Sequence, residues 1–110
     1  MYIRRLDSSA CIPQYTHIGY SLKSCESITI EPLCKKLVDI GISIQMPTGI
    51  YGRIVSLPGL MTIVGEPDYT NHLKILFFNH GEEDICIQIG DIIAQIILQK
   101  FEICPIHFQN

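Results

Sequence analysis

Side chains that could act as acids, bases or ligands gather in one short acidic turn, Glu66-Pro67-Asp68-Tyr69. A carboxylate is chemically suited to activating water, but Glu66 and Asp68 are equally typical of solvated loop residues. A second acidic turn, Glu82-Glu83-Asp84, is most simply interpreted as a solvated face. The sequence predicts no metal site, because its histidines lack metal-ligand spacing (His17, His72, His80 and His107).

Charge and cysteine content exclude several classes of function. The chain has a net charge of −3, and its adjacent basic residues are Arg4-Arg5 and Lys35-Lys36. Nucleic-acid affinity depends mainly on neutralising phosphates, so nucleic acid is not an expected partner. The cysteines are odd in number and lack a C-x-x-C pair, which is typical of reduced thiols. Without a signal peptide or a run of ~18 apolar residues, we expect a soluble intracellular protein of the cytoplasm or nucleus, with no membrane partner.

Short β-strands are the elements expected to position these residues. Apolar side chains recur at every second position in 28–30, 40–46 and 85–89. This period is typical of strands with one buried face. Turn signals rich in Gly and Pro separate the runs and leave little room for a helix. The sequence therefore predicts one all-β domain over residues 1–110, folded as a sandwich or barrel.

Two further runs, 73–78 and 92–98, are apolar at nearly every position. Strands of this kind need cover on both faces. A chain of 110 residues provides such cover with difficulty. The sequence therefore predicts a homo-oligomer.

Several motifs match one enzyme family in order and nearly in spacing. The stretch 36–53, KLVDIGISIQMPTGIYGR, resembles the segment of trimeric dUTPases that leads into their second motif. The other matching segments are 2–13, 19–22, 52–60, 66–69, 76–80 and 90–95. The chain thus resembles the trimeric dUTPase family over nearly its whole length. That resemblance implies a dUTPase-like distorted jelly-roll β-barrel and a homotrimer.

The resemblance also implies an activity, the hydrolysis of dUTP to dUMP and pyrophosphate with magnesium across the three phosphates. The departures from the family pattern concentrate in the phosphate site. Ser21 stands where the first motif has an aspartate, and the arginine and serine of the second motif fall on Leu57 and Pro58. Between Leu60 and Glu66 the chain is shorter than the family pattern. A neutral hydroxyl, a leucine and a proline are poor substitutes for groups that hold metal or phosphate.

Three residues retain the family's site chemistry in vestigial form. Glu66, one methylene longer, falls at the position of the water-activating aspartate and is the catalytic candidate. Tyr69 falls on the tyrosine that discriminates the nucleotide, and Gln95 on the glutamine of the fourth motif, so these two are the nucleotide-binding candidates. Gly52-Arg53 is also retained and is expected to serve the fold, with Gly for a turn and Arg to satisfy buried carbonyls or a carboxylate.

These losses favour a protein that has lost catalysis, needs no cofactor and acts as a binding or signalling module for a host or viral protein. The relatives of that kind are adenoviral early proteins with a dUTPase-like fold. Their C-terminal PDZ-binding motif is not matched by His107-Phe108-Gln109-Asn110, where no counterpart of the family's closing arm is seen either. Two alternatives stay open. One is an active minimal dUTPase that uses magnesium and in which Glu66, Tyr69 and Gln95 work with unidentified phosphate ligands. The other is a sensor that binds dUTP or dUMP without hydrolysing it.

Overall fold

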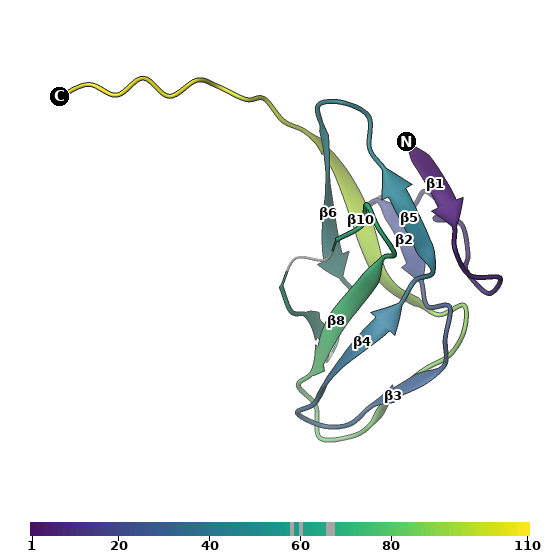
Figure 1. Cartoon of the computed structure of the whole chain (residues 1–110). Helices are drawn as coiled ribbons and strands as arrows, with labels where there is room; N and C mark the ends of the chain where they lie inside the picture. The colour runs from purple at the N-terminus through teal and green to yellow at the C-terminus, as the bar shows by residue number, and fades with distance from the viewer. Residues whose placement is uncertain (58, 60, 66–67) are drawn as a thin grey trace.

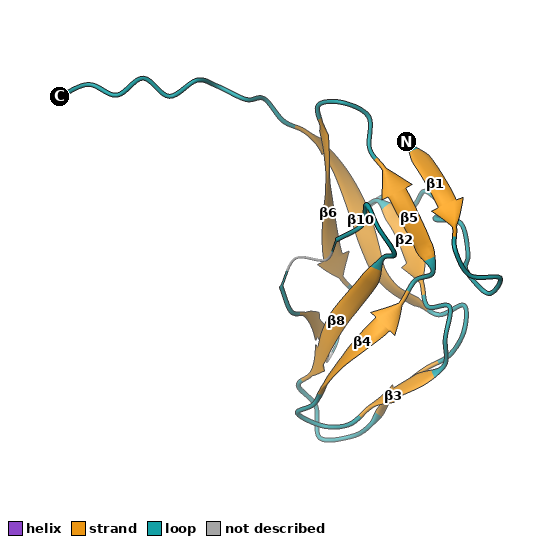
Figure 2. Ribbon diagram, in the orientation of Figure 1, coloured by secondary structure: helices purple, strands orange, loops and turns teal. Residues whose placement is uncertain are grey.

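The computed structural model describes residues 1–57, 59, 61–65 and 68–110, and the regular elements in these ranges are all β-strands (Figure 2). The strands are β1 (Tyr2–Arg5), β2 (Tyr20–Lys23), β3 (Ile28–Ile30), β4 (Lys35–Asp39), β5 (Ile42–Gln45), β6 (Ile50–Ser56), β7 (Met61–Ile63), β8 (Lys74–Asn79), β9 (Ile85–Ile87) and β10 (Ile92–Lys100). The prediction of an all-β chain is confirmed. Within the described ranges, no helical segment has the length and apolar character needed to cross a bilayer.

The strands form small antiparallel sheets that enclose a common core (Figure 1). Three-stranded sheets have the orders β2-β10-β6 and β4-β8-β7, and two-stranded sheets are formed by β1-β5 and β3-β9. Beyond β10, the last residues extend away from the body as an irregular segment (Figure 1). The pairing of β1 with β5 matters for the site, because it brings residues 2–5 against residues 42–45.

The core is built from the inward positions of strands with period-two patterning. On β8, Ile75 and Phe77 are fully buried, whereas Lys74 is exposed. β-Branched isoleucine suits such a half-buried pleated surface, and Ile40, Ile42 and several other isoleucines fill the interior. Burying these side chains is the main favourable contribution to folding.

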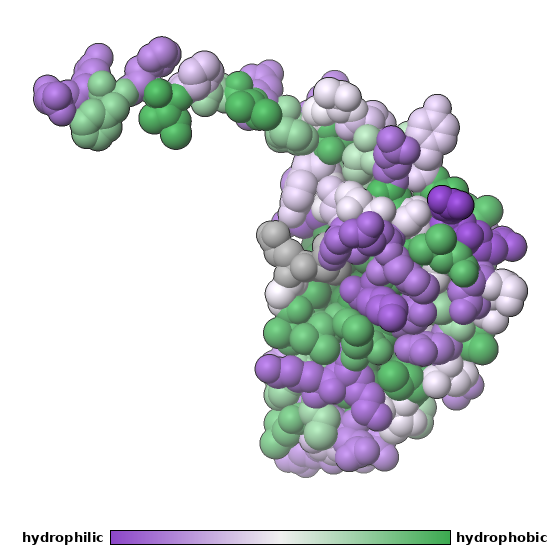
Figure 3. All heavy atoms as spheres, in the orientation of Figure 1, coloured by the Kyte–Doolittle hydropathy of each residue, from purple (hydrophilic) through white to green (hydrophobic). Residues whose placement is uncertain are grey.

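The two continuously apolar runs are covered in different ways. On β10, Ile93, Ala94 and Ile96 are all buried within the single chain, so a partner is not needed to cover the centre of this strand, although Ile92 at its start is 45% exposed. On β8, Leu76 stays only half-buried, and its cross-strand partner Leu37 of β4 is 51% exposed. Figure 3 shows hydrophobic surface in this region of the molecule. The argument for cover by a second copy therefore rests on β8 and β4 rather than on β10.

Candidate functional site

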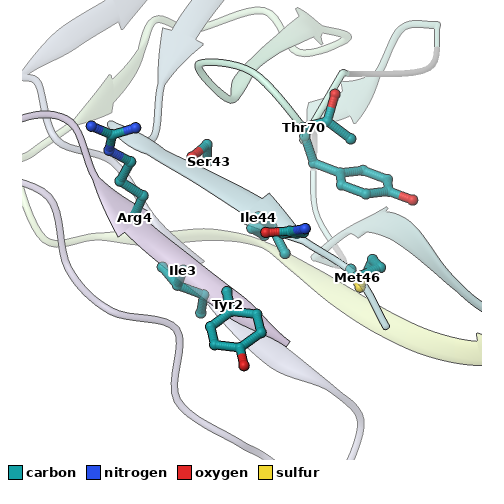
Figure 4. A pocket seen from close by; sticks show the side chains of 9 residues that line it. Tyr2, Ile3, Arg4, Ser43, Ile44, Met46 and Thr70 are labelled. Atoms are coloured by element: carbon teal, nitrogen blue, oxygen red, sulfur yellow. The ribbon is translucent and has the colours of Figure 1, made fainter. Parts of the chain in front are cut away.

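A groove of about 610 Å³ opens over the β1-β5 pair. Its volume lies within the range of ~300–1,000 Å³ that is usual for small-molecule sites. The groove is lined by Tyr2, Ile3, Arg4, Ser43, Ile44, Gln45, Met46, Tyr69 and Thr70 (Figure 4). The lining thus combines an aromatic and apolar floor with a cation, hydroxyls and an amide.

Tyr69 is held in this groove by hydrogen bonds from two strands. The backbone N–H of Ile44 on β5 donates to the carbonyl oxygen of Tyr69 at 2.7 Å. The backbone N–H of Gly52 on β6 donates to the Tyr69 hydroxyl at 3.4 Å. Because both donors belong to regular strands, the ring has a defined position although it follows a loop. Of the predicted nucleotide-binding residues, Tyr69 is the one that lines the groove.

Gly52 has a different role from the one predicted for it. It lies within β6, paired with Leu98 of β10, and not in a turn. A Cβ atom built there would meet Met46 Cε at 2.5 Å and Ile96 Cδ1 at 2.7 Å. Glycine is therefore required by close packing, which lets Met46 reach the floor of the groove. Arg53 beside it is an exposed residue of β6.

Asp68 organises the turn that carries Tyr69. Its carboxylate accepts hydrogen bonds from the backbone N–H and the hydroxyl of Thr70 at 2.9 and 2.7 Å, and from Asn71 Nδ2 at 2.7 Å. The hydroxyl of Thr70, followed by the other donors, lowers the pKa of the Asp68 carboxyl from its usual range. These bonds are typical of an aspartate that stabilises a turn. The sequence left open whether Asp68 is a chemically active carboxylate or a loop residue, and these bonds favour a loop residue that stabilises the turn.

Gln95 lies outside the groove, in the middle of β10. Its side chain is 9% exposed, and the Thr16 hydroxyl is 3.3 Å from its Oε1. Ser21 is its direct cross-strand partner on β2 and is also buried, with its hydroxyl accepting the backbone N–H of Gln14 at 3.2 Å. The structure therefore brings together the first-motif and fourth-motif positions, Ser21 and Gln95. Gln95 does not line the Tyr69 groove, and along β10 it lies three residues, or ~10 Å, from Leu98, the cross-strand partner of Gly52.

The other predicted positions add little in the described residues. Glu66 and Pro58 lie outside the residues that the structure describes. Leu57 is half-buried and has no polar group to offer a phosphate. Across residues 1–57, 59, 61–65 and 68–110, no group of three or more His, Cys, Asp or Glu could hold a metal ion. This finding concerns only sites built from three or more such side chains, whereas magnesium is commonly held by one or two carboxylates together with substrate phosphates and water.

Sequence reasoning missed most of the groove. Ser43 and Gln45 share one face of β5, inside the predicted period-two stretch 40–46. Tyr2 and Arg4 share one face of β1, a segment matched only through the family resemblance. What the sequence does not contain is the pairing of two strands about forty residues apart. Arg4 was considered only as part of a small basic pair.

Comparison with known proteins identifies the class of fold first. The solved structure of a mutant dUTPase from phage phi11 of Staphylococcus aureus superposes with a TM-score of 0.87, covering 98% of this chain and 95% of that chain, at 20% sequence identity. That work describes the coordination of a structural Mg(II) ion in the phage protein. The fold is thus a dUTPase-type jelly roll, as predicted.

Sequence comparison then gives the family. The family model for dUTPase matches residues 8–110. The deoxyuridine 5'-triphosphate nucleotidohydrolase of Saccharomyces cerevisiae is 35% identical over 109 residues, which cover 89% of this chain and 74% of the yeast protein. The enzyme of the same name from Paramecium bursaria Chlorella virus 1 is 33% identical, covering 91% of this chain and 79% of the viral protein. The chain belongs to the dUTPase family.

These relatives overturn the main functional expectation. A catalytically dead binding or signalling module is the wrong interpretation, because the chain is similar to named dUTP nucleotidohydrolases over most of its length. Likewise, the relatives give no support to a degenerate member of the adenoviral type. The physical reason for the error is that Leu57 and Pro58 lie beside the shortened segment, where residue-by-residue alignment is least secure. The absence of the second motif's arginine and serine does not show that catalysis is lost. The groove over β1 and β5 offers other polar groups, and it is not evident from the sequence.

Proposed function

We propose that this protein is a dUTP nucleotidohydrolase, which converts dUTP and water to dUMP and pyrophosphate. The observation that carries the proposal is Tyr69, fixed by Ile44 and Gly52 in a groove of about 610 Å³. Its support comes from the groove's size and mixed lining, which suit a nucleoside, and from the named enzymes at 33–35% identity.

In the proposed reaction, the bond between the α- and β-phosphates breaks as the oxygen of water bonds to phosphorus, and pyrophosphate leaves with the bonding electron pair. Tyr69 positions the nucleoside, and Gln95, which keeps 9% of its surface exposed, is the candidate for a contact on the phosphate side. Glu66 accepts the proton of the attacking water. We take the substrate to be the magnesium complex of dUTP, because the phosphates of such a substrate supply much of the coordination of Mg²⁺. This replaces the expectation that no cofactor is needed, since a coordinated Mg(II) ion is described for the similar phage phi11 dUTPase.

The proposed assembly is a homotrimer. Among the described residues, Gln95 does not line the Tyr69 groove, and we propose that the assembly rather than the single chain completes the substrate site. The half-buried Leu76 and exposed Leu37 supply apolar surface for contacts between copies. Sedimentation at micromolar concentration tests this point, with a species of three 12.4 kDa chains expected and a monomer contradicting it. We propose no further host or viral protein partner.

Phosphorus NMR of the full chain with magnesium and dUTP tests the reaction. We expect dUMP and pyrophosphate as the products, and turnover of dCTP, dTTP and UTP that is at least ~100-fold slower. Cytosine leaves polar groups of the site unpaired, whereas the methyl group of dTTP and the 2'-hydroxyl of UTP need room beside the nucleoside. Orthophosphate as the first product, or equal rates with all four nucleotides, would contradict the proposal. Tight binding of dUTP or dUMP without turnover would indicate a nucleotide sensor instead.

A further inference from the structure

Arg4 and Ser43 form a cation-hydroxyl pair on the lining of the Tyr69 groove. They are direct cross-strand partners on β1 and β5, which places their Cβ atoms about 5 Å apart. Both line the groove, and Figure 4 shows them near one another, with Thr70 toward the other end. The pair is thus a local feature within the same cavity as Tyr69.

The Arg4 charge has no carboxylate partner among the residues that the structure describes. The salt bridge found in those residues joins His72 to Asp39. Asp68, next to Tyr69, is engaged by Thr70 and Asn71 and does not line the groove. A guanidinium has N–H donors in a fixed fork that matches phosphate oxygens, and a neighbouring hydroxyl adds one more donor.

We propose that Arg4, assisted by Ser43, binds a phosphate group of the deoxyuridine nucleotide whose nucleoside lies against Tyr69. The proposal rests on the nucleotide-binding part of the proposed function and adds a binding residue to it. In the family pattern, positive charge for phosphate comes from the second-motif arginine, whose position is Leu57 in this chain. Arg4 would supply such a charge from β1, a different strand. It is a binding residue and takes no proton.

Arg5 provides a matched control. It follows Arg4 on β1, is likewise exposed and does not line the groove. Ile3, which shares the face of Arg5, does line the groove, so Arg5 is distinguished by its position at the end of β1 rather than by its face. Arg4→Gln and Arg5→Gln therefore remove the same charge from neighbouring positions, one inside the groove and one outside it.

The test is isothermal titration of the full-length wild type and both variants with dUMP and, separately, with deoxyuridine. We expect Arg4→Gln to weaken dUMP binding by about tenfold or more, the effect of losing a charged hydrogen bond, and to leave deoxyuridine binding within about twofold. Arg5→Gln should leave both affinities within about twofold. Arg4→Lys should fall between wild type and Arg4→Gln, because it keeps the charge without the fork.

Three results would overturn the proposal. If wild type binds dUMP but Arg4→Gln binds it equally well, the role of Arg4 fails and the proposed function stands. Equal losses in Arg4→Gln and Arg5→Gln would indicate a diffuse surface charge effect. If wild type binds neither dUMP nor deoxyuridine, the nucleotide groove itself is wrong, and both proposals fall. Thermal unfolding of each variant serves as the control that the fold is retained.

Discussion

The hydroxyl of Tyr69 accepts a hydrogen bond from the backbone N–H of Gly52, 17 residues earlier in the chain. This contact ties the loop after β7 to the middle of β6, where glycine is required by Met46 and Ile96. A residue needed for close packing and a residue proposed to bind the nucleoside are thus parts of one local structure. The contribution of the Tyr69 ring to nucleotide binding can therefore be measured separately from the contribution of its hydroxyl to stability.

Tyr69→Ala should chiefly raise the KM for dUTP, whereas Tyr69→Phe should cause only a small loss in the free energy of unfolding. The alanine variant loses the ring from the groove, and we expect the KM for dUTP to rise more than about tenfold. The phenylalanine variant loses one long hydrogen bond, so its free energy of unfolding should fall by no more than about 1 kcal/mol. Steady-state kinetics and urea unfolding measure the two effects. Tyr51→Phe, on exposed β6 surface, is the control and should change neither quantity. Equal KM values for Tyr69→Ala and wild type would remove Tyr69 from the site.

Gln95→Leu tests whether the buried amide serves the substrate or the fold. The Thr16 hydroxyl keeps its bond to the Gly19 carbonyl oxygen at 2.8 Å, so no buried donor is stranded by the change. We expect the free energy of unfolding to change by less than about 1.5 kcal/mol, while kcat/KM for dUTP falls at least tenfold, or about 1.4 kcal/mol. Gln99→Leu, near the exposed end of β10, is the control and should keep full activity. Unchanged kcat/KM in Gln95→Leu would mean that the amide is only structural.

Asn79→Ala should be among the most destabilising single changes in the chain. The buried side chain of Asn79 donates to the carbonyls of Ile30 at 3.0 Å and Glu83 at 2.8 Å and accepts the N–H of Gly81 at 2.8 Å. Removing it leaves buried backbone groups unpaired, which costs roughly 2–4 kcal/mol. Chemical denaturation measures this cost. Asn71→Ala, which loses one exposed bond to Asp68, should cost less than about 1 kcal/mol. Similar costs for the two variants would contradict the account.

Cys25 makes stability fall at alkaline pH. Burial, followed by the charge of Asp39, raises the pKa of its thiol from 9.0 to about 12. Below about pH 9 the thiol is protonated in both the folded and the unfolded chain, and its contribution to the free energy of unfolding is fully present. Between pH 9 and 12 only the unfolded chain loses this proton, so stability falls by up to about 1.4 kcal/mol per pH unit.

Chemical denaturation of Cys25→Ala measures this contribution. The variant should lose stability less steeply than wild type over pH 9 to 12, whatever its stability at neutral pH. Cys86→Ala, which alters an exposed thiol, serves as the control and should follow the wild-type slope. Parallel curves for Cys25→Ala and wild type would show that the Cys25 thiol does not titrate differently in the folded protein.

The fold could be predicted from the sequence because its signals are local. The period-two runs mark β3, β5 and β9, and the two continuously apolar runs mark β8 and β10, each within a few residues of where the strand lies. The order of the motifs indicated the family. Burial of the β10 centre inside one chain could not be predicted, because apolar runs do not say which strands cover them.

The site was harder to predict, for two physical reasons. The groove depends on the pairing of Arg4 with Ser43 and on the Gly52 contact to Tyr69, which are long-range relationships without a local pattern. The interpretation of lost catalysis rested on substitutions at Ser21, Leu57 and Pro58, on the shortened segment before Glu66 and on the missing counterpart of the closing arm. Substituted positions show which groups have gone, but they do not show which groups elsewhere could take their place.

The most direct test of the proposed activity is the rate of pyrophosphate release from dUTP with magnesium, measured for the full-length wild type and for Glu66→Gln at equal concentrations. The yeast relative serves as the positive control. We expect wild type to release pyrophosphate and dUMP in equal amounts well above the buffer rate, and Glu66→Gln to be slower by at least ~100-fold, as for loss of a general base. A wild-type rate indistinguishable from buffer, under conditions where the yeast enzyme turns over, would contradict the proposal that this chain is a dUTP nucleotidohydrolase.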